Sequence, residues 1–122
     1  MQLTITVREK QGVTILELNG RVVAGEECDT LRKKIKELQA AGPTKTLLNL
    51  ADVVRLDSTG IGMLVESVIN AAKQGGQFKL FNVPRLLRSI LSTHRLLQAF
   101  EVFDNEDDAL RSFAQPAQQV AS

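Results

Sequence analysis

Hydroxyl and carboxylate side chains stand together in one short segment of the sequence, which also contains two glycines. The segment reads Asp57-Ser58-Thr59-Gly60-Ile61-Gly62. Hydroxyls at the start of a helix can cap free backbone N–H groups, act as nucleophiles or accept a phosphoryl group, and the helix N-terminus favours negative charge. A purely structural interpretation is also open, in which Asp57 and Ser58 only cap a helix. Gly60 and Gly62 would then permit close packing on a sheet.

Known catalytic and nucleotide-binding motifs do not match this segment. A nucleophile elbow needs glycine two residues before the serine, where Leu56 stands. A P-loop ends in Gly-Lys-Ser/Thr, which does not occur in the sequence, and a dinucleotide-binding loop needs a third glycine where Val65 stands. The single histidine, His94, is expected to be a helix C-terminal cation. An enzyme with Ser58 as nucleophile would therefore lack a base, and we do not expect catalysis.

The composition excludes several kinds of site and partner. The chain has one cysteine, Cys28, and one histidine, which excludes an internal disulfide and an all-cysteine metal site; no cofactor is expected. Acidic residues nearly balance the basic ones, and the formal net charge is +1. The chain therefore lacks the excess of positive charge that binding to a nucleic-acid backbone requires. The basic run Arg32-Lys33-Lys34 is expected to be a solvated helix face balanced by neighbouring glutamates.

Signals for membrane insertion or secretion are missing from the sequence. No apolar run approaches the ~18 residues of a transmembrane helix, and the first residues lack a basic region followed by an apolar one. We therefore expect a cytoplasmic protein without membrane insertion. With five Phe and no Trp or Tyr, the core must be aliphatic, and a stacking platform for bases or sugars is absent.

The elements that must position residues 57–62 are strands and helices in alternation. Period-two patterns predict strands over 3–7 and 13–18, joined at Gln11-Gly12 into a hairpin that ends at Asn19-Gly20. Further along, the patterns predict a helix over 25–41, a strand over 45–50, a helix after Asp57, a strand over 78–81, a helix from Pro84, a strand over 100–103 and a helix through 109–113 capped by Asp104-Asn105.

The helix after Asp57 has the strongest periodicity. Its predicted buried stripe consists of Ile61, Leu64, Val65, Val68, Ile69 and Ala72. Gly75-Gly76 ends this helix. The order ββαβαβαβα predicts a single α/β domain over residues 1–114, with a mixed sheet flanked by helices, and a polar tail over 115–122.

These features together resemble the STAS domain family, which includes the anti-sigma-factor antagonists and the cytoplasmic domains of sulfate transporters. The resemblance rests on residues 57–62, on Leu47-Leu48-Asn49-Leu50 and Val53 before them, and on the matching order of elements. It runs from Leu3 to about Phe113 and favours the anti-sigma-factor antagonist branch. The family implies a mixed sheet flanked by helices, with a phosphorylated serine or threonine at the helix start.

By this resemblance, Ser58 is the phosphoacceptor, Thr59 is the runner-up, and Asp57 is the acid of the motif. The antagonist branch implies that the unphosphorylated protein binds an anti-sigma factor, itself a serine kinase, so that a sigma factor is released. Phosphorylation ends the binding, and a serine phosphatase restores it. The partner surface is expected to comprise residues 57–62 and Arg21.

One departure from the family pattern follows the hairpin. Family members commonly carry Gly-Glu-Leu-Asp there, whereas this chain has Gly20-Arg21-Val22-Val23. If this loop lies beside Ser58, Arg21 can pair with a phosphate; otherwise it is expected to face solvent or pair with Glu26. The missing acid keeps a second function open, that of a standalone STAS domain in another assembly, such as a stressosome component or the cytosolic subunit of a lipid-transport ATPase system.

Overall fold

The structure, a computed structural model, describes residues 3–93 and 100–114. His94 and the tail at 115–122 lie outside these ranges, so the expectations for them stay predictions. The elements are β1 (Leu3–Lys10), β2 (Val13–Val22), α1 (Glu26–Ala40), β3 (Lys45–Leu56), α2 (Ser58–Lys73), β4 (Gln77–Phe81), α3 (Arg85–Thr93), β5 (Val102–Phe103) and α4 (Glu106–Ala114). The predicted order ββαβαβαβα is confirmed.

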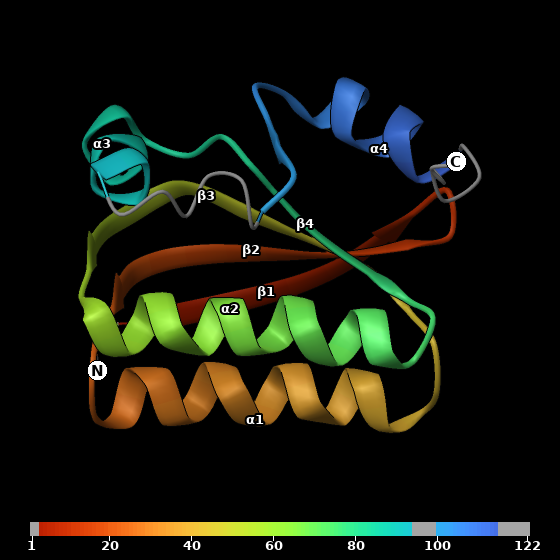
Figure 1. The fold of residues 1–122 in the computed structure, drawn as a ribbon, viewed down its shortest axis with the longest axis horizontal. Helices are drawn as coiled ribbons and strands as arrows, with labels where there is room; N and C mark the ends of the chain where they lie inside the picture. Colours follow the sequence, from red (N-terminus) through yellow and green to blue (C-terminus); the bar gives the residue numbers. More distant parts are fainter. Residues whose placement is uncertain (1–2, 94–99, 115–122) are drawn as a thin grey trace.

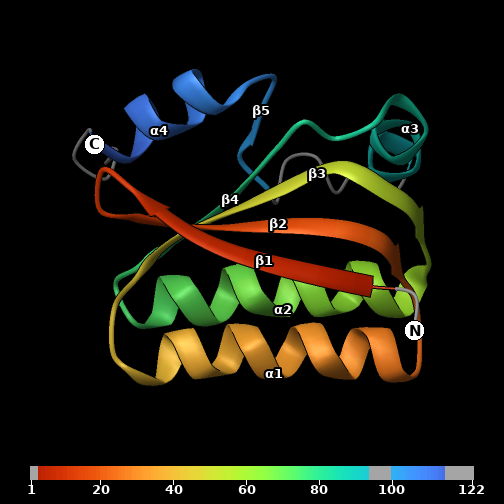
Figure 2. The same cartoon turned by 180° about the vertical axis from the view of Figure 1, so that it is seen from behind.

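The strands form one mixed sheet in the order β1-β2-β3-β4-β5. β1 is antiparallel to β2, and every later neighbouring pair is parallel. α1 and α2 lie side by side across one face of the sheet, while α3 and α4 stand apart over the other face (Figure 1). Seen from behind, β1 runs along the edge of the sheet beside α1 (Figure 2). Short connections bring the starts of α1 and α2 to the carboxyl ends of β2 and β3.

Three strands continue well past the ranges that the sequence pattern predicted. β1 continues to Lys10, β2 continues past Asn19-Gly20 to Val22, and β3 runs without a break to Leu56. Gly20 has a φ of 125°, and the register of β2 with β3 shifts on both sides of Asn19-Gly20. A glycine with this backbone lets a strand bulge and then resume its pairing. The predicted end of the hairpin at Asn19-Gly20 is therefore wrong.

An aliphatic core fills the space between the sheet and the α1–α2 layer, as the composition predicted. Its most buried members include Leu16, Leu48 and Leu80 of the sheet, Leu31 of α1 and Leu64 of α2. A smaller cluster under α4 consists of Val13, Ile15, Leu47, Phe81, Ala109, Leu110 and Phe113. The neighbours Leu47 and Leu48 belong to different clusters, so β3 is buried on both faces, as predicted.

The buried face of α2 differs from the predicted stripe. Ile69 is 48% exposed and Ala72 is also exposed. The buried positions are Gly60, Met63, Leu64, Ser67 and Ala71, and the half-buried ones include Ile61, Val65 and Val68. Ser67 tolerates burial because its hydroxyl donates to the carbonyl of Met63 (2.9 Å), while its own carbonyl accepts the Gln39 amide (3.2 Å). The small residues Gly60, Ser67 and Ala71 thus face the core beside Met63 and Leu64, which a count of large apolar residues does not reveal.

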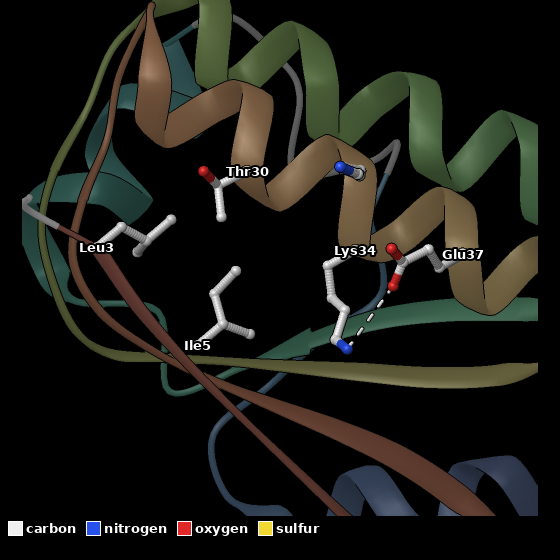
Figure 3. Close-up of a pocket in the computed structure, with 6 residues that line it drawn as sticks. Leu3, Ile5, Thr30, Lys34 and Glu37 are labelled. Atoms are coloured by element: carbon white, nitrogen blue, oxygen red, sulfur yellow. Dashed lines mark ion pairs between the residues drawn. The ribbon is translucent and has the colours of Figure 1, made fainter.

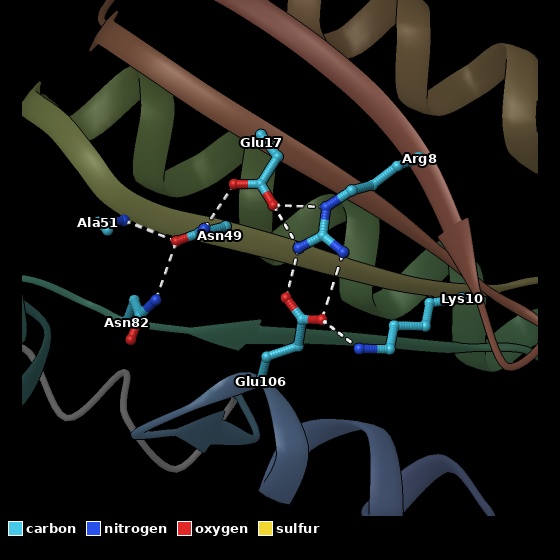
Figure 4. A network of polar contacts seen from close by, with 7 residues as sticks. All are labelled: Arg8, Lys10, Glu17, Asn49, Ala51, Asn82 and Glu106. Atoms are coloured by element: carbon cyan, nitrogen blue, oxygen red, sulfur yellow. Dashed lines mark hydrogen bonds and ion pairs between the residues drawn. The ribbon is translucent and has the colours of Figure 1, made fainter.

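A polar network ties α4 to the hairpin on the less covered face of the sheet. Arg8 Nε donates to Glu17 (2.9 Å), and Arg8 Nη1 donates to Glu106 in the first turn of α4 (3.2 Å; Figure 4). Lys10 approaches Glu106 at 3.5 Å. The hydrogen bond from Arg8 holds the pKa of Glu106 below its ordinary value, so this carboxylate is charged at neutral pH.

The predicted starts of the last two helices are confirmed in part. Pro84 precedes α3, and its carbonyl accepts the N–H of Arg88 (2.8 Å). Asn105 caps α4, since its Oδ1 accepts the N–H of Asp108 (2.9 Å). Asp104, expected to share this role, lies 3.4 Å from the Arg88 guanidinium instead.

Candidate functional site

The candidate site lies where two parallel strands end and two helices begin. Val22 at the end of β2 is the register partner of Leu56 at the end of β3. The N–H of Asp57 donates to the carbonyl of Val22 (3.4 Å). α1 and α2 both start at this end of the sheet (Figure 1). The loop between β2 and α1 therefore lies beside the start of α2, which is the condition that the Arg21 hypothesis required.

Asp57 fixes the geometry of this end of the sheet. Its Oδ1 accepts the N–H of Gly60 (2.9 Å), which makes it the cap of α2, and its Oδ2 accepts the N–H of Ala24 in the loop before α1 (2.9 Å). The bond from Ala24, with the N–H groups of α2, lowers the pKa of Asp57. The Asp57 carboxylate is therefore ionised, and it links the loop before α1 to the start of α2.

Ser58 and Thr59 are exposed and form the start of α2. Neither hydroxyl has a hydrogen-bond partner among residues 3–93 and 100–114. Capping belongs to Asp57, so the structural interpretation in which Ser58 also caps the helix is wrong. Two hydroxyls are thus open to a partner or a modifying enzyme, beside a fixed carboxylate.

The two glycines of the segment serve different purposes. A Cβ on Gly60 would stand 2.3 Å from the carbonyl oxygen of Val22 and 2.8 Å from Leu56, so α2 can approach the strands only with glycine here. A Cβ on Gly62 would meet nothing within 4 Å. Close packing explains Gly60 and does not explain Gly62, which is exposed on the outer side of the helix. Ile61, between them, is half-buried against the core.

Arg21 lies at the edge of this site and is engaged by α1. Its Nη2 is 3.6 Å from the carboxylate of Glu27, whose side chain is only 9% exposed, whereas that of Arg21 is 44% exposed. The expected alternatives were solvent, Glu26 or a phosphate on Ser58, so the sequence named the wrong partner. In the unphosphorylated protein, Glu27 is therefore the carboxylate that pairs with Arg21.

Arg55 is a second cation that the sequence did not assign to this end of the sheet. It is exposed and is the register partner of Arg21 between β2 and β3. Within the ranges that the structure describes, Arg55 has no ion pair. Its position two residues before Asp57 could have placed it near the site from the sequence. Its pairing with Arg21, however, depends on the bulge at Asn19-Gly20, which the sequence pattern did not reveal.

Neighbouring groups offer no obvious metal ligands or thiol chemistry. Cys28 is buried, and burial, helped by the charge of Asp57, raises the pKa of its thiol, so the thiolate is disfavoured. No group of three His, Cys, Asp or Glu side chains suited to a metal occurs in the described part of the chain. Across the same residues, no helix combines the length and apolar character that crossing a membrane requires.

Comparison with known proteins gives consistent matches over most of the chain. The STAS domain model matches residues 4–109. An anti-sigma-B factor antagonist from Bacillus subtilis (strain 168) is 30% identical over 109 residues, which cover 86% of this chain and 88% of that protein. An anti-sigma F factor antagonist from Paenibacillus polymyxa is 25% identical over 111 residues, 90% of this chain and 94% of that protein.

The fold also matches solved structures. The crystal structure of an anti-sigma factor antagonist from Mycobacterium paratuberculosis superposes with a TM-score of 0.82 at 22% identity. The match covers 93% of this chain and 95% of that one. The predicted α/β fold with a mixed sheet flanked by helices is confirmed.

Proposed function

The chain belongs to the STAS domain family, and from this premise we propose that it is an anti-sigma factor antagonist switched by phosphorylation at Ser58. Unphosphorylated, it binds an anti-sigma factor that is also a serine kinase, and a sigma factor is released. Phosphate on Ser58 ends the binding until a serine phosphatase removes it. The protein acts in the cytoplasm as a binding module rather than as an enzyme. The observation that carries the proposal is the exposed Ser58 hydroxyl at the start of α2, beside Asp57.

The names of two relatives support the choice of partner. Both are antagonists of anti-sigma factors, and each is matched over most of its length. Ser58 is preferred over Thr59 as phosphoacceptor because it matches the position of the family motif, and because it is the first residue of α2. Thr59 is the second candidate, since it is exposed as well.

The hydrogen bonds of Asp57 explain how a phosphate at Ser58 would act. A phosphoserine adds about −1.5 to −2 charges. Asp57 already uses the N–H of Gly60 and the N–H of Ala24, so the phosphate cannot take these donors without displacing it. The new charge is left at the surface, next to an ionised carboxylate. A partner that buried both would lose several kcal/mol from like-charge contact, without any refolding of this domain.

The partner surface in this proposal lies at the start of α2. Ser58, Thr59 and Gly62 are exposed along the first turns of α2, and Gly62 leaves open space where a side chain would stand. Arg21 and Arg55 border it from the strand ends. We propose that Asp57, Gly60 and Ile61 contribute mainly by positioning this surface, since they cap α2 or pack inward.

A capture experiment from native lysate tests the proposal. Wild-type protein and Ser58→Ala should retain an anti-sigma factor identified by mass spectrometry, and Ser58→Asp should lose it. Ser92→Asp, at an exposed serine of α3, is the matched control and should behave like wild type. Incubation with the captured kinase and ATP, followed by phosphopeptide mapping, should find phosphate on Ser58. Equal capture by wild type and Ser58→Asp, or phosphate only on Thr59, would contradict the proposed switch.

The pairing of Arg21 favours a second candidate function. A cation held by Glu27 stands where family members commonly carry an acid, and this changes the charge that a kinase would meet. The second candidate is a standalone STAS domain in another assembly, either a stressosome component or the cytosolic subunit of a lipid-transport ATPase system. The same capture experiment separates the two, because it would then return a multiprotein assembly or a membrane transporter instead of an anti-sigma factor.

A further inference from the structure

The outer edge of β1 is the long open edge of the sheet in the part of the chain that the structure describes. β1 pairs with β2 on one side only, whereas the opposite edge is formed by β5, which has two residues. Charged side chains often protect such an edge from pairing with another chain. Here Arg8 and Lys10 are instead engaged by Glu106, on the α4 face. Glu9 is then the one charged residue of β1 that has no ion pair in the described part of the chain.

A groove runs between this edge and α1. It has a volume of about 490 Å³ and is lined by Leu3, Ile5, Thr30, Lys33, Lys34 and Glu37. Figure 3 shows Leu3 and Ile5 on β1 facing Thr30 and Lys34 on α1. Val7 follows Ile5 on the same side of β1, because side chains alternate along a strand, and it is 41% exposed. An apolar row on an open strand thus faces a partly cationic helix.

We propose that a second copy of this chain pairs with β1 in antiparallel fashion, about a two-fold axis at Thr6, to form a symmetric dimer with a continuous sheet. In a continuous sheet, both copies turn the same face of β1 toward their own α1 helices. Odd-numbered residues of one copy must therefore stand opposite odd-numbered residues of the other, and even-numbered residues opposite even-numbered ones. With the axis at Thr6, Ile5 of each copy lies opposite Val7 of the other. The two exposed valines are then covered by isoleucines.

Charge complementarity supports a second copy as the occupant. The same register places Glu9 of one copy opposite Leu3 of the other, at the groove that Lys33 and Lys34 line. Glu9 and Lys33 are both exposed, and neither has an ion pair among the described residues. Lys34 is already 3.8 Å from Glu37, so Lys33 is the cation left for Glu9. The chain thus carries both halves of the contact, as an isologous interface requires.

Two other registers also keep odd-numbered residues opposite odd-numbered residues, with the two-fold axis at Val7 or at Ile5, and both fit less well. An axis at Val7 would move Glu9 from Leu3 to Ile5 and would leave Leu3 opposite Gln11, which lies outside β1. An axis at Ile5 would place Glu9 opposite Met1, outside the described residues, and would limit the paired part of β1 to Leu3–Val7. The axis at Thr6 also sets two threonine hydroxyls opposite each other, a favourable pair across antiparallel strands.

Sedimentation of the full chain over a dilution series up to millimolar concentration tests the dimer. Wild type should show a monomer–dimer equilibrium. Val7→Lys should raise the dimer dissociation constant at least about tenfold, because each substitution acts twice across the two-fold axis. Val54→Lys is the matched control, since Val54 is 73% exposed on β3, and it should leave the constant unchanged. Thermal melting checks that each variant is folded.

A charge exchange tests the register. Glu9→Lys and Lys33→Glu should each weaken the dimer, and the double variant should restore it. A wild-type protein that stays monomeric throughout the series overturns the proposal, as does a dimer that Val7→Lys leaves intact. A double variant no tighter than the singles overturns the pairing at Thr6. The inference does not depend on phosphorylation of Ser58, so the two proposals can fail separately.

Discussion

The carboxylate of Asp57 accepts a hydrogen bond from the backbone N–H of Ala24, 33 residues away in the sequence, at 2.9 Å. Its second oxygen binds the N–H of Gly60 at the same distance. These bonds lock the loop before α1 to the start of α2. Ser58 is thereby held at a defined place on the surface, which a binding partner or a kinase needs for recognition.

Removing the Asp57 carboxylate should destabilise the domain. Asp57→Ala deletes the cap of α2 and the bond to Ala24, and we expect a loss of about 1–3 kcal/mol in the free energy of unfolding. Urea denaturation measures this loss. Asp52→Ala, an exposed carboxylate on β3, is the control and should change stability by less than about 0.5 kcal/mol. Ser58→Ala should resemble the control, because Ser58 does not cap the helix.

The contribution of Asp57 should depend on pH. Its pKa is lower in the folded protein than the ordinary value of about 3.9 in the unfolded chain, so the folded state favours the charged form. The stabilisation is present above about pH 4 and is lost as the pH falls through the folded pKa. Asp57→Asn should therefore be less stable than wild type at neutral pH, and the difference should shrink in acid. A difference that grows on acidification would show that the sign is wrong.

The two glycines of α2 offer a matched pair of substitutions. Gly60→Ala forces a Cβ to within 2.3 Å of the Val22 carbonyl oxygen and should cost about 1–3 kcal/mol. Gly62→Ala meets nothing within 4 Å and should stabilise the exposed helix by up to about 1 kcal/mol. Thermal melting of both variants measures the contrast. Equal melting temperatures would mean that α2 does not approach β2 as closely as described.

The sequence predicted the element order and the 57–62 segment because both depend on local patterns. Alternation, glycines and the motif marked each strand and helix, including the strand buried on both faces around Leu47 and Leu48. The extension of β2 to Val22 and the pairing of Arg21 with Arg55 depend on a bulge. A bulge is set by contacts between strands, which a single-strand pattern does not contain. The Arg21–Glu27 pair is a consequence of the same extension.

The buried face of α2 predicted from the sequence differs from the one in the structure, and two substitutions test which is right. Leu64 is 1% exposed, and Leu64→Ala should cost about 2–5 kcal/mol by leaving a cavity. Ile69 belongs to the apolar stripe that the sequence predicted, yet it is 48% exposed, so Ile69→Ala should cost less than about 1 kcal/mol. Urea midpoints decide between the two orientations. Both residues belong to the predicted stripe, so an Ile69→Ala as costly as Leu64→Ala would restore the face predicted from the sequence.

Arg21 has two possible anions, Glu27 and a phosphate on Ser58, and their competition can be measured. In the unphosphorylated protein Arg21 lies 3.6 Å from Glu27, a carboxylate that is 9% exposed and would be left uncompensated without it. We therefore expect Arg21→Gln to cost more than the ~1 kcal/mol of a fully exposed pair. Because Glu27 already holds Arg21, phosphorylation should shift the melting temperatures of wild type and Arg21→Gln equally. In Glu27→Gln the guanidinium is released and can bind the phosphate, so phosphorylation should stabilise this variant more. A stabilising shift in wild type that disappears in Arg21→Gln would show that the phosphate displaces Glu27, and Arg21 would then be part of the switch itself.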